Sequence, residues 1–415
     1  MKYVNLRTYT TASDKFGIFN IDAAIQKIND NPEEYSKSFA ITEYLNMFSF
    51  IDFYKQVKGV DGFNPIFGVE LDIASLKNNN IERQEYELFP NLFIAKNESG
   101  YQNLCKLQTL FYKSKKKDRI FQEDFFNENK KDLLNDVYIL SGGSRGFIFN
   151  KFKLYLNEKD ENNKKLYLNE INSNILFWKE QTNNNFFIEI QRDGTQYENE
   201  FIKFIIPLSI ELGVPVVATN NTFFTNKEDY GTHELFMAHK NDYKVSNSHN
   251  APINVTPENY LKSNSEMSEL FKDVPVALEN SVFISESCDL SFKLKSGKYY
   301  LPTIDSPNPS ENVNEFFARL SKEGMDEILI GFLDTYCHKS AILPNNDYFR
   351  KFQEWIDLDL DLDSMTAPQK LAMIEKTNLY QEYLNRLNYE IDTICEMKFP
   401  SYFLVVSDFI KWSKS

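Results

Sequence analysis

The sequence predicts an α/β protein in which a seven-stranded β/α barrel is followed by a smaller, mostly helical part. Up to Thr219, seven short β-type runs alternate with amphipathic helical stretches. Repeated strand–helix alternation is typical of a parallel sheet or a barrel, and seven strands suit a closed barrel better than an open sheet. Beyond a segment rich in helix and strand breakers, apolar residues recur mainly at helical spacing.

The first region contains the predicted sheet. Its strands are expected at Tyr3–Tyr9, Phe39–Thr42, Ile66–Ile73, Leu92–Ala95, Val137–Leu140, Phe186–Ile190 and Val214–Thr219. Apolar residues three and four positions apart predict the helices between them. These helices are Ile21–Ile28, Phe48–Val57, Tyr101–Tyr112 and Glu198–Leu212.

The second region begins after a predicted linker. Gly, Pro and Ser are frequent in Lys295–Pro302 and Ser306–Ser310, which favours an irregular connection. Helices are expected after it, at Val313–Ile330, Ala367–Glu375 and Leu379–Glu396. A chain of 415 residues fits two or three domains, and we place two, at residues 1–290 and 291–415. The final residues show no C-terminal stop signal, so a truncated chain is expected.

Composition excludes several classes of protein. Hydrophobic residues make up 42% and aromatic residues 15% of the chain, too many for disorder throughout. With only 14 Gly and 14 Pro, a collagen-like chain is also excluded. The net charge of −14 argues against a simple basic coat for nucleic acid, because overall repulsion would oppose phosphate binding.

Cysteine usage and the N-terminus indicate the compartment. Cys105, Cys288, Cys337 and Cys395 lie far apart and form no C-x-x-C pair, so a zinc ribbon or a dithiol redox motif is excluded. Sparse cysteine suits a reducing compartment. There is no apolar signal core and no apolar run near ~18 residues, the usual length of a membrane span. We therefore expect a soluble, cytoplasmic protein without a membrane partner.

Functional groups of a β/α barrel gather at the C-terminal ends of its strands. Metal-dependent hydrolysis needs several His, Asp or Glu ligands at one point, and none of the four histidines lies at a predicted strand end. One carboxylate pair remains, Glu43 and Glu70. It could share a proton or hold a weak Mg²⁺, but two carboxylates in a polar barrel mouth are the favoured interpretation. The strand ends offer Arg7, Tyr9, Glu43, Tyr44, Glu70, Gly142, Gly143, Gln191, Arg192, Asn220 and Asn221.

Other patterns are weaker. His233 and His239 are six residues apart, out of step with a helical zinc pair. The alternating run Asp357–Asp363 fails the EF-hand pattern and reads as an edge strand or a solvated insert. The basic cluster Lys113–Arg119 could touch DNA phosphates, although solvation of a helix end is favoured. The loop Ser141–Gly146 lacks the Lys of a Walker motif.

Taken in order, nine segments resemble the N-terminal part of the bacterial replicative (C-family) DNA polymerase III alpha subunit. The first domain of that family is of the polymerase-and-histidinol-phosphatase (PHP) type, a distorted, TIM-like seven-stranded barrel, and it is followed by the start of the polymerase palm. The likeness spans nearly the whole chain and is weaker near residues 150–180 and 335–375. The segments are Ala40–Asn46, Phe67–Leu71, Ala95–Leu104, Val216–Asn221, Tyr260–Ser263, Glu269–Phe271, Ala277–Asn280, Tyr299–Pro302 and Met397–Ile410.

The resemblance also locates the metal pocket of intact family members, which is built from His, Asp, Glu and Cys. An Asp of that pocket falls near Phe16, with Asp14 close by, and a further His falls on Pro90. Only Glu70 keeps its family identity, so the resemblance implies a vestigial pocket without catalytic or metal-ligating residues. We expect Arg7 to pair with Glu70 in place of the lost ions. The pocket positions are Arg7, Tyr9, Tyr44, Glu70, Gly143, Asn221 and Phe223.

For function, the resemblance implies an N-terminal fragment of a DNA-directed DNA polymerase, a nucleotidyltransferase of DNA replication that uses Mg²⁺ and primer–template DNA. The fragment is expected to end before the palm aspartates, and therefore to bind no cofactor and not to polymerise. In relatives with degenerate barrels a separate proofreading exonuclease docks on this domain, so that subunit and other replicase subunits are the implied partners.

Two alternatives stay open. One is a free-standing PHP-type phosphoesterase or 3′–5′ exonuclease with an atypical metal site. The other is a stand-alone binding protein, which predicts a gene that ends near Ser415, whereas the polymerase hypothesis predicts a reading frame that continues.

Overall fold

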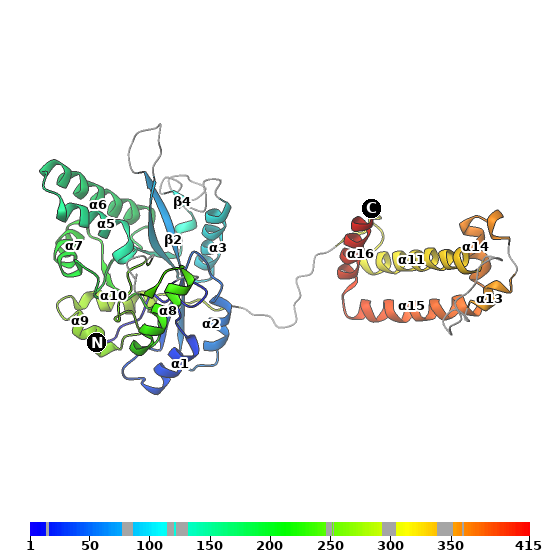
Figure 1. The fold of residues 1–415 in the computed structure, drawn as a ribbon, viewed down its shortest axis with the longest axis horizontal. Helices are drawn as coiled ribbons and strands as arrows, with labels where there is room; N and C mark the ends of the chain where they lie inside the picture. Colours follow the sequence, from blue (N-terminus) through cyan, green and yellow to red (C-terminus); the bar gives the residue numbers. More distant parts are fainter. Residues whose placement is uncertain are drawn as a thin grey trace. The chain divides into compact units, whose positions relative to one another are not determined.

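The structure is a computed structural model, and it describes residues 1–13, 16–76, 86–113, 120–121, 132–245, 251, 253–292, 304–337, 352–358 and 361–415 (Figure 1). The chain divides into two compact units, Met1–Lys293 and Leu294–Ser415. Each unit has its own buried core. No helix in the described part of the chain combines the length and the apolar character needed to cross a bilayer.

The first unit is built on one mixed sheet. Along the sheet the strands run in the order β1-β2-β3-β5-β6-β7, and β4 pairs with β2 off this path. Neighbouring strands are parallel except at β2–β3 and β3–β5, which are antiparallel. The strands are β1 (Ser38–Tyr44), β2 (Asn64–Leu76), β3 (Tyr86–Ala95), β4 (Ile120–Phe121), β5 (Val137–Leu140), β6 (Phe186–Ile190) and β7 (Val216–Ala218).

The N-terminal segment does not form the first strand that the sequence predicts. It makes only isolated parallel bridges, Asn5 with Phe39 of β1 and Thr8 with Thr222 after β7. Its backbone N–H and C=O groups bond partly to β1 and partly to the segment after β7. Neither edge of the sheet therefore forms enough consecutive hydrogen bonds with it to make a strand. Because one segment reaches both edges, the sheet must curl. The structure thus confirms a curled mixed sheet with a six-strand path, and the expected seven-stranded TIM-like barrel is not confirmed.

Helices surround this sheet (Figure 1). Side chains that accept bonds from the first free N–H groups fix several helix starts: Asn20 caps α1, Asp160 caps α6, and Ser263 with Glu266 forms a capping box at α9. The helices are α1 (Ile21–Asp30), α2 (Phe50–Val57), α3 (Glu98–Lys113), α5 (Phe147–Asn157), α6 (Glu161–Gln181), α7 (Glu198–Leu212), α8 (Tyr230–Lys240), α9 (Asn264–Leu270) and α10 (Pro275–Glu286), with 3₁₀ turns η2 (Asp132–Leu134), η3 (Gly143–Arg145) and η4 (Lys227–Asp229).

Apolar side chains between sheet and helices form the main core. Phe39, Phe53 and Phe67 are fully buried there, and Phe39 and Phe53 have ring centroids 4.9 Å apart. The core therefore lies between the sheet and its helical cover, which leaves the strand ends free for polar side chains.

The second unit is helical in its described part. Trp355 is buried at its centre, and the indole Nε1 donates a hydrogen bond to Thr377 Oγ1 at 2.9 Å. Of the run Asp357–Asp363, residues 359–360 lie outside the described residues. The rest is turn and 3₁₀ helix with Leu362 buried, so the edge-strand interpretation is wrong for that part. The helices are α11 (Val313–Tyr336), α13 (Gln353–Ile356), α14 (Ala367–Ile374), α15 (Asn378–Glu396) and α16 (Pro400–Lys414), with the turn η6 (Leu362–Ser364).

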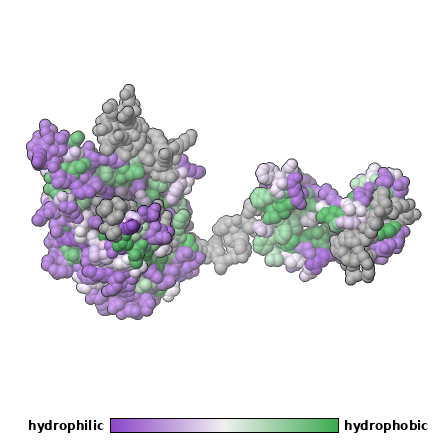
Figure 2. All heavy atoms as spheres, in the orientation of Figure 1, coloured by the Kyte–Doolittle hydropathy of each residue, from purple (hydrophilic) through white to green (hydrophobic). Residues whose placement is uncertain are grey.

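Helix α16 carries exposed apolar side chains. Phe409 is 65% and Trp412 is 81% exposed, and Figure 2 shows apolar residues gathered at the end of the unit where α16 lies. Only Pro400 and Leu404 of this helix are buried. Such a face is prone to association.

Candidate functional site

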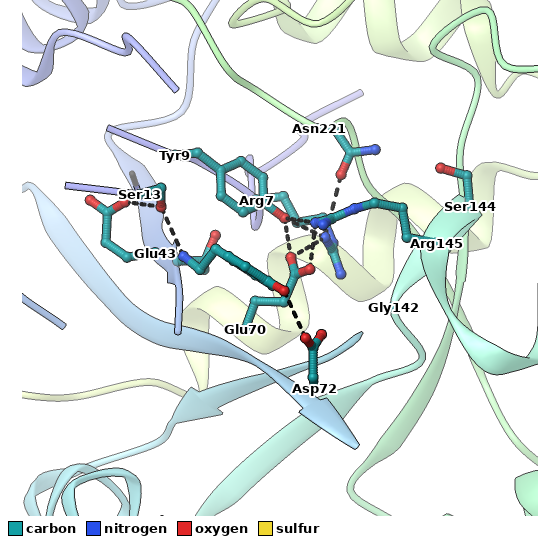
Figure 3. A network of polar contacts seen from close by, with 12 residues as sticks. Arg7, Tyr9, Ser13, Glu43, Glu70, Asp72, Gly142, Ser144, Arg145 and Asn221 are labelled. Atoms are coloured by element: carbon teal, nitrogen blue, oxygen red, sulfur yellow. Dashed lines mark hydrogen bonds and ion pairs between the residues drawn. The ribbon is translucent and has the colours of Figure 1, made fainter. Parts of the chain in front are cut away.

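A buried polar network lies at the end of the sheet where β1 and β6 finish, level with the middle of β2, where the sequence predicts functional groups (Figure 3). The N-terminal segment contributes Arg7 and Tyr9, β2 contributes Glu70, β6 contributes Glu189, and the turn after β5 contributes Arg145. We call these five residues the mouth network. They come from four segments far apart in the sequence, so the fold alone brings them together.

Arg7 is the centre of the mouth network. Its Nη1 lies 2.7 Å from Glu70 Oε2, and its Nε lies 2.6 Å from Glu189 Oε1. A further bond, from Nη2 to Glu189 Oε2 at 3.2 Å, makes the contact with Glu189 bidentate. The expected Arg7–Glu70 pair is thus confirmed, and Glu189 is a second partner that the sequence did not reveal.

Burial and the carboxylates act in opposite directions on Arg7. Its side chain is fully buried, and burial by itself would lower the pKa of the guanidinium. The carboxylates of Glu189 and Glu70 raise the pKa well above its ordinary value, so the cation persists without water around it. A buried arginine held in this way is a fixed positive charge.

Arg145 supplies a second cation. Its Nη2 donates to Glu70 Oε1 and, at 3.0 Å, to the Tyr9 hydroxyl. Its guanidinium carbon also lies 5.6 Å from the ring centroid of Phe16, within the range of a cation–π contact. Two guanidinium groups therefore face two carboxylates, and the formal charge of the mouth network is zero.

Tyr9 and Phe223 fill the space beside these charges. The Tyr9 hydroxyl donates to Glu70 Oε2, and its ring stacks on Phe223 with centroids 4.9 Å apart. Burial raises the pKa of Tyr9, which keeps the hydroxyl protonated as a donor. Both aromatic rings are buried, so they occupy volume that side-chain ligands and ions need in an intact pocket.

The remaining predicted pocket residues surround the mouth network. Asn221 Oδ1 lies 3.4 Å from Arg7 Nη1. Tyr44 points instead to Asp72, with its hydroxyl 2.7 Å from Asp72 Oδ2 (Figure 3). Gly143 has a positive φ of 57°, and a side chain on it would meet the Gln191 amide. All seven predicted pocket positions thus lie at one end of the sheet, although Tyr44 and Gly143 do not touch Arg7.

Glu43 and Glu70 do not form the carboxylate pair that the sequence allows. Glu43 accepts hydrogen bonds from the hydroxyls of Thr10, Ser13 and Ser49, the last at 2.6 Å. Burial raises the pKa of Glu43, although these hydroxyl groups pull in the opposite direction. Each carboxylate has its own partners, since Glu70 belongs to the mouth network.

Histidine contributes packing at this end of the sheet. His233 is buried on α8, with its Nε2 2.6 Å from the Phe16 carbonyl oxygen and its ring 5.7 Å from that of Phe223. Burial lowers its pKa, which keeps the ring neutral. His239 is exposed, and His249 and His338 lie outside the described residues.

A metal cluster does not fit this donor set. Both oxygens of Glu70 accept bonds from guanidinium or phenol groups, and Arg7 places a fixed positive charge beside this carboxylate. Among the described residues no three His, Cys, Asp or Glu side chains converge as metal ligands would.

Other predicted positions lie apart from the mouth network or outside the structure. Pro90 is buried in β3, paired with Asp72 of β2, and it supplies no ligand atom. Asp14 and residues 114–119 of the basic cluster lie outside the described residues, so that cluster stays a prediction.

Sequence reasoning missed two members of the mouth network. Glu189 lies inside the apolar run Phe186–Ile190, whereas attention to strand ends selects Gln191 and Arg192. The sequence does contain one indication of its role: Glu189 is a lone carboxylate in a strand that is otherwise apolar, and a buried charge of this kind needs a partner of opposite charge. Arg145 belongs to the loop Ser141–Gly146, which the sequence allows to be compared only with a Walker motif and which gives no sign of an ion pair.

Two buried acidic residues, Asp193 and Glu198, lie next to each other near Asn221. Asp193 Oδ2 accepts from Asn221 Nδ2 at 3.0 Å, and Glu198 accepts from the backbone N–H of Asp193 at 2.8 Å. Burial, together with the hydrogen bond to Asp193, raises the pKa of Glu198 to about 9. Glu198 is therefore protonated in the folded chain at neutral pH.

This proton makes the folding stability depend on pH. Between about 4.5 and about 9 the folded chain holds a proton on Glu198 that the unfolded chain releases. The stabilisation is complete at the acid end of this range and is lost as pH rises through it. When the pH is raised from 6 to 9, the melting temperature of the unchanged chain should fall by about 3 °C more than that of Glu198→Gln. Thermal unfolding at several pH values measures this, with the exposed Glu200→Gln as the matched control; identical profiles for all three proteins would contradict it.

Comparisons with known proteins agree with this architecture. Residues 6–193 match the PHP domain, and residues 361–415 match the bacterial DNA polymerase III alpha NTPase domain. The chain is 28% identical to DNA polymerase III subunit alpha of Haemophilus influenzae over 414 residues, 100% of the chain and 30% of that relative. For the same subunit of Pseudomonas aeruginosa the values are 28% over 419 residues, again 100% and 30%. For Escherichia coli K12 they are 27% over 379 residues, 91% and 27%.

The chain thus spans about 30% of the length of the curated relatives that it matches over its whole length. It matches their N-terminal region, and its two family matches follow the order of the two compact units. The chain is therefore similar to a PHP domain in its first unit and to the bacterial DNA polymerase III alpha NTPase domain at the end of its second unit, and it is similar over its full length to DNA polymerase III alpha subunits.

Proposed function

We propose that the first unit is a PHP domain that has exchanged metal-dependent hydrolysis for a structural role in a replicative DNA polymerase. One observation carries this proposal: both carboxylate oxygens of Glu70, which the resemblance implies to be a retained pocket position, are engaged by Arg7, Arg145 and Tyr9. A metal would have to displace two guanidinium groups that cannot lose their charge. On this proposal, the curled sheet and its bridging N-terminal segment correspond to the distorted seven-stranded barrel of that domain type.

For the whole protein we propose DNA-directed DNA polymerase activity with primer–template DNA and Mg²⁺. The similarity to polymerase alpha subunits over the full chain supports it. Mg²⁺ would act at carboxylates of the palm, where two-metal transfer of a nucleotide takes place. We expect these 415 residues alone not to polymerise.

We further propose that the first unit is a docking surface for a proofreading exonuclease subunit. A domain without its own hydrolytic site leaves proofreading to another polypeptide. Phe48 is 79% exposed and Leu235 is 64% exposed on this unit, and exposed apolar side chains of this kind are suited to anchor a partner.

Metal content and turnover test the structural role. After incubation with Mn²⁺ or Zn²⁺ and desalting, mass spectrometry should find far less than one ion per chain. Metal-stimulated release of phosphate or of 3′ nucleotides should be absent. Turnover that depends on metal and disappears in Glu70→Gln would instead establish the alternative, a phosphoesterase with an atypical site.

The docking role is tested by copurification with the cognate exonuclease subunit, in which Phe48→Ser is compared with the exposed control Lys203→Ser. Failure of the two purified proteins to associate at high concentration would count against it.

A further inference from the structure

A cavity lies beside helix α8 of the first unit (Figure 1). Its volume is about 480 Å³, within the range of roughly 300–1,000 Å³ that small-molecule sites occupy. It is lined by α8 and by the chain that follows this helix, and its polar residues include Tyr230, His233, Glu234 and Tyr243. None of its described lining residues belongs to the mouth network or to the seven predicted pocket positions.

His233 lines this cavity and carries a buried nitrogen without a partner. Its Nε2 lies 2.6 Å from the Phe16 carbonyl oxygen, which can only accept, so Nε2 carries the proton. Burial lowers the pKa of the ring and keeps it neutral. Nδ1 therefore has a lone pair, and it has no hydrogen-bond partner in the described structure. An unsatisfied buried acceptor is costly, and an N–H donor from a ligand would remove that cost.

Glu234 adds a negative charge that the described chain does not balance. Its carboxylate Oε1 accepts a hydrogen bond from the Tyr230 hydroxyl at 3.0 Å, but no Lys or Arg among the described residues forms an ion pair with it. Glu258 shows the contrast, because it contacts both Lys227 and Lys262. The described lining of the cavity likewise contains a carboxylate and no Lys or Arg. A negative charge in a concave surface attracts cations.

Aromatic and apolar side chains surround this carboxylate. Burial, and after it Glu234, raises the pKa of both Tyr230 and Tyr243, so both phenol groups lie near the negative charge. The electron-rich faces of such rings attract cations as well. The apolar wall of the cavity includes Met237, Ile253 and Val255.

We propose that this cavity binds an organic cation, with an ammonium or guanidinium head against Glu234 and an apolar body along the apolar wall. The charged N–H groups would pair with the carboxylate, the two tyrosine rings would face the same charge, and a further N–H would bond to His233 Nδ1. A bare metal ion is a poorer match, since no three His, Cys, Asp or Glu side chains of the described residues converge here. The site does not depend on the proposed role in replication.

Isothermal titration calorimetry with benzamidine, a planar organic cation, tests the site in the 415-residue chain. We expect saturable binding, and roughly tenfold weaker or still weaker binding of benzamide, which has nearly the same shape but no charge. Glu234→Gln should weaken the binding of benzamidine by a similar factor. The matched control is Glu200→Gln, which removes an exposed carboxylate from α7 and should bind like the unchanged chain. Melting temperatures show whether each variant is folded, and Tyr243→Leu replaces Glu234→Gln if the latter is not.

The imidazole nitrogen gives an independent readout. In a ¹H–¹⁵N NMR spectrum of the histidine rings, Nδ1 of His233 should appear as an unprotonated nitrogen. Its signal should move when benzamidine is added, because the lone pair then accepts a hydrogen bond. A signal that stays in place when the site is saturated would overturn the proposal.

A competition titration with Nα-acetylargininamide distinguishes two sources of the cation. Tighter binding of this compound than of benzamidine assigns the site to a basic side chain of a polypeptide, and weaker binding assigns it to a free small cation. Both results support the site. Heat that never saturates, equal affinity for benzamide and benzamidine, or unchanged affinity in a folded Glu234 or Tyr243 variant would overturn it.

Discussion

Arg7→Met is expected to lower the free energy of unfolding by about 3–5 kcal/mol, the range found when one partner of a buried ion pair is removed. Methionine retains most of the volume, so the loss is chiefly electrostatic. Glu189 would lose both bonds from Arg7, and Glu70 would keep only Arg145 and Tyr9. Two carboxylates would then share one cation in a place without water.

Urea unfolding followed by circular dichroism measures this effect. The double variant Arg7→Met/Glu189→Gln should recover part of the loss, because the amide removes the unpaired negative charge. Lys272→Met is the control: it breaks an exposed pair with Glu269 and should leave the urea midpoint unchanged. An unchanged midpoint for Arg7→Met, or no recovery in the double variant, would show that the mouth network does not stabilise the fold as argued.

Gly142→Ala is expected to be the second strongly destabilising change, by roughly 2–5 kcal/mol. Gly142 has a φ of +89°, and a Cβ there would collide with the backbone carbonyl oxygen of Pro90. Its N–H also donates to Glu189 Oε2 at 2.7 Å, so any shift of this turn disturbs the mouth network.

The neighbouring glycine provides a graded comparison. At Gly143 the added Cβ would meet only the end of the Gln191 side chain, which can shift by giving up hydrogen bonds to Thr219 and Ser144, whereas the Pro90 backbone cannot; φ is +57°. Gly143→Ala should therefore cost about 1–2 kcal/mol, the usual penalty for a left-handed alanine. Gly231→Ala, where no atom lies within 4 Å, should cost nothing. Equal urea midpoints for Gly142→Ala and Gly143→Ala would contradict the collision with Pro90.

Most of the strand positions could be predicted from the sequence, but not their directions. The runs Val137–Leu140 and Phe186–Ile190 are strands with those bounds in the structure. Alternation with helices predicted parallel neighbours, yet β2 and β3 are antiparallel. The short connection of residues 77–85 is the physical reason, because a parallel crossover needs a dozen or more residues.

The sequence predicted one ion pair of the mouth network, Arg7 with Glu70, but it did not predict the two other charged members, Glu189 and Arg145. Arg7 was matched to Glu70 because both occupy positions of a metal pocket. Glu189 and Arg145 hold no such positions, and their roles depend on how β6 and η3 are placed in three dimensions. A single sequence gives the number of charges but not their pairing. The proximity of residues 182 positions apart is a property of the tertiary fold.

The bridging position of the N-terminal segment has a consequence for synthesis of the chain on the ribosome. Arg7 and Thr8 are made well before their partners Glu189 and Thr222, which emerge much later. At ~5–20 residues per second, roughly 10–40 s of translation separate them. During that interval the Arg7 guanidinium is still hydrated and unpaired with Glu189. The segment can take its native position only after the strand edge that contains Thr222 has left the exit tunnel. The bridging segment is thus made before the strands that it joins, yet it is among the last parts of this unit to reach its native place.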